Sequence, residues 1–74
     1  MKKKNVTFVG LGYIGLPMAL LFANNRYNTI GYDIDKKKIN DLNENNISFD
    51  ENQIKDLFFK KKRKIYFTNK LVKS

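Results

Sequence analysis

Residues 9–17 read VGLGYIGLP and hold three of the chain's four glycines. Gly10, Gly12 and Gly15 have the spacing G-x-G-x-x-G. Alone, this spacing is a weak indication of a phosphate-binding turn. It becomes specific when a strand precedes it, a helix follows it and an acidic residue stands about 20 positions further on.

The residues around the turn supply this context. Residues 6–9, VTFV, are β-branched and aromatic and predict a short buried strand that Gly10 ends. Helix-favouring residues run from 14 to about 26, with Pro17 in the first turn, where its missing N–H has no intrahelical partner. A second strand is expected over 29–32, and Asp33 follows it directly.

Each residue of the motif then has a physical role. Gly10 allows a tight turn out of the strand, Gly12 leaves room for a pyrophosphate beside the backbone, and Gly15 lets helix and strand pack closely. The free N–H groups at the start of the helix attract phosphate. Asp33 is expected to accept hydrogen bonds from ribose hydroxyls and to repel a 2′-phosphate, which favours NAD over NADP.

Two more helices and a third strand are expected downstream. Asp35 suits the N-cap of a helix over 36–43. A capping box at 50–53 starts the next helix, the basic run 60–64 closes it, and 65–68 predict a strand. The residues expected to face the core from these helices are Ile39, Leu42, Ile54, Leu57 and Phe58.

This alternation of strands and helices predicts an α/β fold with a parallel sheet. We expect the N-terminal portion of a Rossmann-type doubly wound sheet, truncated after about three strands. Residues 1–74 then form one partial NAD-binding domain.

Composition narrows the function. The chain has no cysteine and no histidine, which argues against a thiolate metal site, a disulfide framework or a self-sufficient hydrolase. We therefore assign no catalytic and no metal-binding residue. With 74 residues, any hydrophobic core is small.

A formal charge of +8 raises the alternative of a small basic protein that binds nucleic acid or an anionic surface. Specific nucleic-acid contacts rely on arginine, and only Arg26 and Arg63 are present. The excess is better explained by a lysine-rich composition, and no nucleic-acid partner is expected.

A second alternative is a signal peptide, because residues 6–23 carry no charge and follow three lysines. In the sequence LLFANN, however, Leu21 stands where the first small residue of an A-x-A-like cleavage site should be. Three glycines with Pro17 also weaken a membrane helix. We expect no membrane association and a cytoplasmic location.

The segments VGLGYIGLPMAL, IGYDID, DLNENNISFDENQI and KIYFT together resemble the start of the UDP-glucose/GDP-mannose dehydrogenase family. The resemblance covers essentially the whole chain and implies NAD as cofactor and oxidation of a nucleotide sugar at its C6 alcohol. It implies backbone contacts from Tyr13 and Ile14 to the cofactor phosphates and a ribose contact from Asp33. The resemblance offers Lys38 as a second ribose or phosphate contact. The alternatives are that Lys36 or Lys37 makes this contact or that all three lysines are solvated.

The chain departs from the family at Asn52, where a proline is usual after the glutamate matched by Glu51, and in its length. The resemblance places the catalytic cysteine and lysine beyond residue 74 and implies that the catalytic and substrate domains are absent from residues 1–74. We expect a fragment that is inactive alone, that meets a nucleotide sugar only with the rest of the enzyme, and that self-associates through its first strand. A fragment of a β-hydroxyacid dehydrogenase, which opens with a similar GLPMA pattern, is the alternative within the dehydrogenases.

Overall fold

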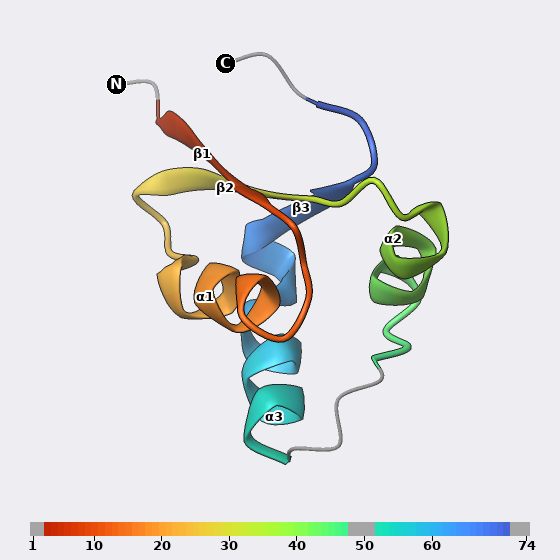
Figure 1. Ribbon diagram of the computed structural model, residues 1–74. Coiled ribbons are helices and arrows are strands. Elements are labelled where there is room, and N and C mark those ends of the chain that lie inside the picture. The colour runs from red at the N-terminus through yellow and green to blue at the C-terminus, as the bar shows by residue number, and fades with distance from the viewer. Residues whose placement is uncertain (1–2, 48–51, 72–74) are drawn as a thin grey trace.

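The computed structural model describes residues 3–47 and 52–71 (Figure 1). The elements follow the predicted order of strand, helix, strand, helix, helix, strand. They are β1 (Lys4–Val9), α1 (Gly15–Phe22), β2 (Tyr27–Tyr32), α2 (Lys36–Asn43), α3 (Asn52–Lys61), a 3₁₀ turn η1 (Lys62–Lys64) and β3 (Ile65–Thr68).

The three strands form one parallel sheet in the order β1-β2-β3. Val6 lies opposite Thr29 of the central strand, and Thr29 lies opposite Ile65. Parallel strands joined by helical connections, with the first strand beside the second, match one half of a Rossmann sheet. The predicted fold class is therefore confirmed.

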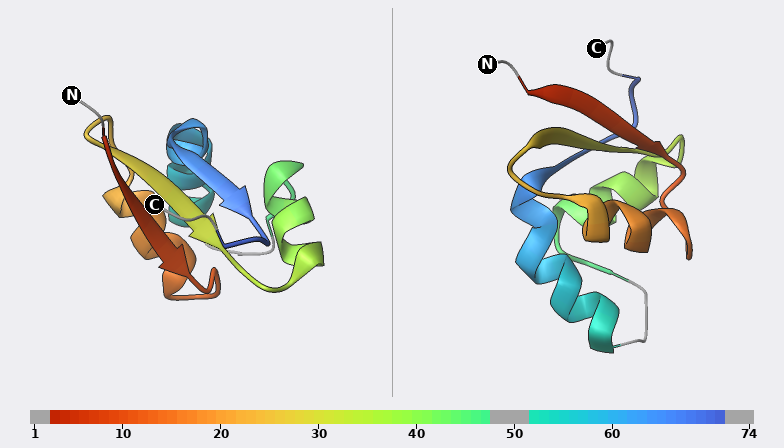
Figure 2. Two further views of the ribbon diagram at one scale, coloured as in Figure 1. Left: turned by 90° about the horizontal axis from the view of Figure 1, so that it is seen from above. Right: turned by 90° about the vertical axis from the view of Figure 1, so that its left-hand side faces the viewer.

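All three helices lie on the same face of the sheet, as the two orientations in Figures 1 and 2 show. The hydrophobic core lies between these helices and the sheet. Phe58 of α3 is fully buried and stacks on Phe67 of β3 with ring centroids 6.1 Å apart. The rings of Phe8 and Tyr27 both contact Phe22 at the end of α1. Helix packing on this one face thus supplies the core.

The other face of the sheet leaves large side chains exposed, and this corrects the expectation for β1. Residues 6–9 predict a buried strand, but β1 is an edge strand and Val9 is 71% exposed. Tyr66 of β3 is 63% exposed. The physical reason is that no helix of the described residues covers this face, so burial is confined to side chains that point towards the helices.

Helix α1 is shorter than predicted and ends at Phe22 instead of about residue 26. The Asn24 side chain donates to the Phe22 carbonyl at 2.7 Å, and its oxygen accepts from the Arg26 N–H at 2.7 Å. These local bonds replace the next helical turn, as asparagine side chains commonly do. Strand β2 consequently starts at Tyr27, two residues earlier than expected.

The downstream predictions hold where the structure describes them. Asp35 caps α2, since its side chain accepts from the N–H groups of Lys37 and Lys38. Helix α2 has the predicted bounds, and Ile39 and Leu42 are buried. Of the expected capping box, Asp50 lies outside the described residues, as does Glu51. Within the described ranges no helix is long and apolar enough to cross a membrane.

Candidate functional site

The glycine turn joins β1 to α1 at the carboxyl ends of the strands. Gly10 has a φ of +92°, a conformation that side chains disfavour, and its N–H donates to the Tyr32 carbonyl at 2.8 Å. A Cβ on Gly15 would lie 1.7 Å from the Gly10 carbonyl oxygen. These two glycines therefore let the chain turn sharply and let α1 start against the end of β1.

Gly12 differs, because a Cβ built on it meets no atom within 4 Å. A side chain there would project into open space beside the start of α1. The N-cap residue of α1, Ile14, makes no side-chain capping bond, and Tyr13 and Ile14 are 85% and 75% exposed. An anion can therefore approach the positive end of the helix at this point.

Asp33 is brought to the turn from the end of β2. Its Oδ2 accepts from the Leu11 N–H at 2.9 Å, and its Oδ1 accepts from the Asp35 N–H at 2.9 Å. The residue is 9% exposed. Burial raises the pKa of this carboxyl, but the two N–H donors and the charge of Lys38 outweigh burial and hold the pKa below its usual range. Asp33 is thus a carboxylate at neutral pH.

Lys38 reaches the same carboxylate from the first turn of α2. Its Nζ lies 3.6 Å from Oδ2 of Asp33, and its side chain is 38% exposed. The N-cap bond of Asp35 to the Lys38 N–H, at 3.3 Å, fixes the helix turn that carries it. The structure therefore brings together all seven residues selected from the sequence: Gly10, Gly12, Tyr13, Ile14, Gly15, Asp33 and Lys38.

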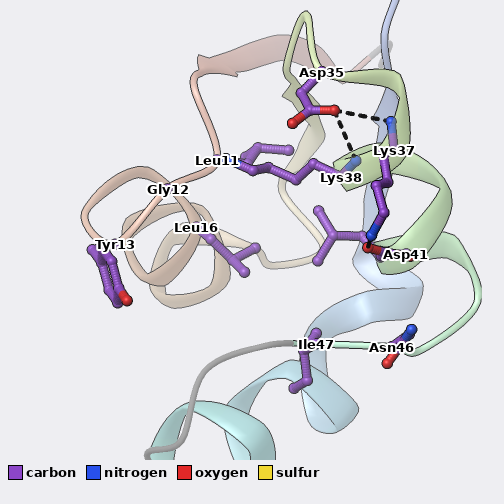
Figure 3. A pocket seen from close by; sticks show the side chains of 11 residues that line it. Leu11, Gly12, Tyr13, Leu16, Asp35, Lys37, Lys38, Asp41, Asn46 and Ile47 are labelled. Carbon is purple, nitrogen blue, oxygen red and sulfur yellow. Dashed lines mark hydrogen bonds and ion pairs between the residues drawn. The ribbon is translucent and has the colours of Figure 1, made fainter.

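A pocket of about 290 Å³ opens between the glycine turn and α2 (Figure 3). Leu11, Gly12, Tyr13 and Leu16 line one side, and α2 with its following loop lines the other. From the α2 side of the pocket the sequence selected Lys38, with Lys37 as an alternative, but it selected neither Leu11, whose N–H holds Asp33, nor Leu16. The lining residues of α2 and its following loop that were not selected for the site are Asp35, Asp41, Leu42, Asn46 and Ile47.

For part of this set, the only signal in the sequence is the spacing of two charged residues on one helix. Lys37 and Asp41 are four residues apart on one helix, and they form an ion pair at 3.3 Å. Asn46 and Ile47 follow Asn45, whose φ of 65° turns the chain after α2. Their place beside the glycine turn depends on how the loop folds back.

Together these features fit a dinucleotide. An uncapped helix start and an open Gly12 suit a pyrophosphate, and a carboxylate at the end of the neighbouring strand suits ribose hydroxyls. Fold and site define a dinucleotide-binding domain of Rossmann type.

More particularly, the chain belongs to the UDP-glucose/GDP-mannose dehydrogenase family, because residues 4–74 match that family's NAD-binding domain. NAD is accordingly its cofactor. Membership confirms the expected resemblance, and it favours this family over the β-hydroxyacid dehydrogenases.

Known proteins are similar to this chain in sequence and in structure. The chain is 42% identical over 50 residues to UDP-N-acetyl-D-mannosamine dehydrogenase of Methanococcus vannielii. This alignment covers 68% of the present chain and 12% of that enzyme. The structure of UDP-D-ManNAc dehydrogenase from Pyrococcus horikoshii superimposes with a TM-score of 0.78 and 32% identity, over 89% of this chain and 16% of that one. A UDP-glucose dehydrogenase from Pyrobaculum islandicum shares the fold, with a TM-score of 0.77, 20% identity and coverage of 93% and 16%. The chain therefore spans about an eighth of the length of the curated relative.

Proposed function

We propose that this chain is the NAD-binding part of a nucleotide-sugar 6-dehydrogenase of the UDP-N-acetyl-D-mannosamine type. Such an enzyme oxidises the C6 alcohol of the sugar to a carboxylate for polysaccharide precursors, and NAD accepts the hydrides. The observation that carries the proposal is the junction of the glycine turn with the Asp33 carboxylate, where Leu11 donates to Oδ2. The relatives named above support the choice of sugar nucleotide.

The residues take the following roles. The backbone of Gly12, Tyr13 and Ile14 holds the pyrophosphate at the start of α1. Each oxygen of Asp33 accepts one backbone hydrogen bond and keeps further acceptor capacity for the ribose hydroxyls. Lys38, beside it, offers a second polar contact. Because a carboxylate repels a 2′-phosphate, the site selects NAD over NADP.

The chain's own side chains bind and orient, and catalysis falls to residues supplied by the rest of such an enzyme. The sequence contains no cysteine, and so it lacks the nucleophile that the family resemblance implies. The nucleotide sugar is then a partner only when that remainder is present. We place the protein in the cytoplasm and propose self-association through the edge of β1 when it is alone.

An NMR titration with NAD tests the proposal. A dissociation constant of about 1 mM, equivalent to about −4 kcal/mol, is expected for half of a cofactor site. Gly12→Val places a branched side chain where the pyrophosphate lies and should abolish the shifts. Leu21→Val, at an exposed position of α1 outside the pocket, should leave them unchanged. Equal shifts for wild type and Gly12→Val would refute the assignment of the turn.

A further inference from the structure

A second groove, of about 560 Å³, lies at the amino ends of the strands, the edge of the sheet opposite the glycine turn. We call it the amino-edge groove. Its volume lies within the range of about 300–1,000 Å³ that is usual for ligand pockets. Its lining residues are Lys3, Asn5, Asn24, Asn25, Tyr27, Asn28, Thr29, Ile30, Arg63, Lys64, Ile65 and Tyr66.

The charged residues that line this groove are all positive. All seven acidic residues of the chain fall between residues 33 and 56. The lining comes from residues 3–30 and 63–66, two segments without any acid that the parallel sheet brings side by side. Lys3, Arg63 and Lys64 are the lining cations, and no described carboxylate pairs with them. The ion pairs of the described residues lie at α2, on the other edge.

The remaining lining groups suit a base as well as a phosphate. The ring of Tyr66 is 63% exposed and offers a face for stacking. Asn25 adds an exposed amide.

Composition alone predicts no nucleic-acid partner, because base-specific contacts rely on arginine. From the placement of these residues we propose instead that the amino-edge groove binds single-stranded nucleic acid without base-specific contacts, with Lys3, Arg63 and Lys64 on the phosphates and Tyr66 stacked on a base. A positive groove with an exposed aromatic ring is how single strands are bound without sequence preference. A duplex keeps its bases stacked and cannot use Tyr66. A membrane surface requires protruding apolar anchors, whereas this groove is hollow and lined by amides and cations.

Fluorescence anisotropy of the full chain with a short labelled oligouridylate tests this. The affinity should fall with salt with a log–log slope of about −2, because three cations contact phosphates. Arg63→Gln with Lys64→Gln should reduce the magnitude of that slope by about 1.4. Lys55→Ala with Lys60→Ala removes the same charge from exposed positions of α3 outside the groove and should leave the slope unchanged. Tyr66→Val should weaken binding at least about fivefold.

The other outcomes each overturn the proposal. If both double variants reduced the salt slope equally, the oligonucleotide would be attracted by the net charge of the chain alone. Binding of uridine monophosphate as tight as that of the oligonucleotide would make the ligand a free nucleotide. Preference for a matched duplex or for phosphatidylserine vesicles would assign the groove to those surfaces. NAD should not displace the oligonucleotide, since the two sites lie on opposite edges, and displacement would place the strand at the glycine turn. Circular dichroism checks that each variant keeps its fold.

Discussion

The Leu11 N–H donates a 2.9 Å hydrogen bond to Oδ2 of Asp33, which lies 22 residues further along the chain. This bond ties the glycine turn after β1 to the end of β2. It satisfies a buried donor in the turn and holds the carboxylate that is proposed to bind ribose. One side chain therefore stabilises the turn and, in the proposed function, also selects the cofactor.

Asp33→Ala is expected to weaken NAD binding by about tenfold or more, since hydrogen bonds to a charged group contribute about 1.5–3 kcal/mol. NADP binding should improve relative to NAD because the repulsion of the 2′-phosphate is removed. Calorimetric titration with both cofactors measures the ratio. Glu44→Ala, an exposed position with the same loss of charge, is the control. Equal NAD and NADP affinities in the unmutated chain would contradict the role of Asp33.

Asp33 also predicts a dependence of stability on acid. Its folded pKa lies below the ordinary value of 3.8, so the unfolded chain binds the proton more readily. The stabilisation is complete above that ordinary value and is lost as the pH falls through the lowered pKa. Urea unfolding between about pH 6 and about pH 2 should show a stability gap between wild type and Asp33→Asn that shrinks with acid. A gap independent of pH would mean that the carboxylate is not stabilised by its partners.

Substitution by alanine should be tolerated at Gly12 but not at Gly15. Gly15→Ala places a Cβ 1.7 Å from the Gly10 carbonyl oxygen, a backbone atom that cannot move aside, and is expected to unfold the chain. Gly12→Ala meets nothing within 4 Å and should keep the wild-type fold. Circular dichroism and amide NMR spectra of the two variants provide the comparison. A folded Gly15→Ala chain would show that the contact between α1 and the turn is less close than described.

Lys61 makes a long-range cap that can be tested alone. Its Nζ donates to the Ala23 carbonyl at 2.8 Å and joins the last turn of α3 to the end of α1. Lys61→Ala is expected to lower the free energy of unfolding by about 1 kcal/mol. Lys60→Ala, its exposed neighbour, should change it by less than about 0.5 kcal/mol. Equal effects of the two substitutions in chemical denaturation would reduce the cap to a surface contact.

The isolated chain is expected to be marginally stable and without activity. In the full strand order 3-2-1-4-5-6 the first strand has neighbours on both sides, whereas β1 here pairs with β2 alone among the described strands. Such an edge invites pairing with another chain. Calorimetry should show a broad transition, gel filtration should show association, and NAD should not be reduced with any nucleotide sugar. A sharp transition in a monomer would refute the first expectation, and formation of NADH the second.

The sequence by itself determined the local parts of this protein. The spacing of Gly10, Gly12 and Gly15 required a turn, and Asp35 marked the start of α2 at the residue where the structure places it. These features depend on the backbone conformation of a few neighbouring residues, and a short sequence pattern is enough to predict them. The family resemblance came from longer segments that contain these residues, VGLGYIGLPMAL and IGYDID among them.

Only the tertiary structure decided the rest. The composition of residues 6–9 predicts burial and the Rossmann order predicts an unpaired edge there, and only the structure showed that Val9 itself is 71% exposed. The bonds from Leu11 to Asp33 and from Lys61 to Ala23 cross 22 and 38 residues, and no local pattern announces either of them. The amino-edge groove likewise exists only because parallel pairing gathers the amino ends of three separate strands. Sequence patterns report what a residue prefers, whereas these contacts depend on which segments the sheet brings together.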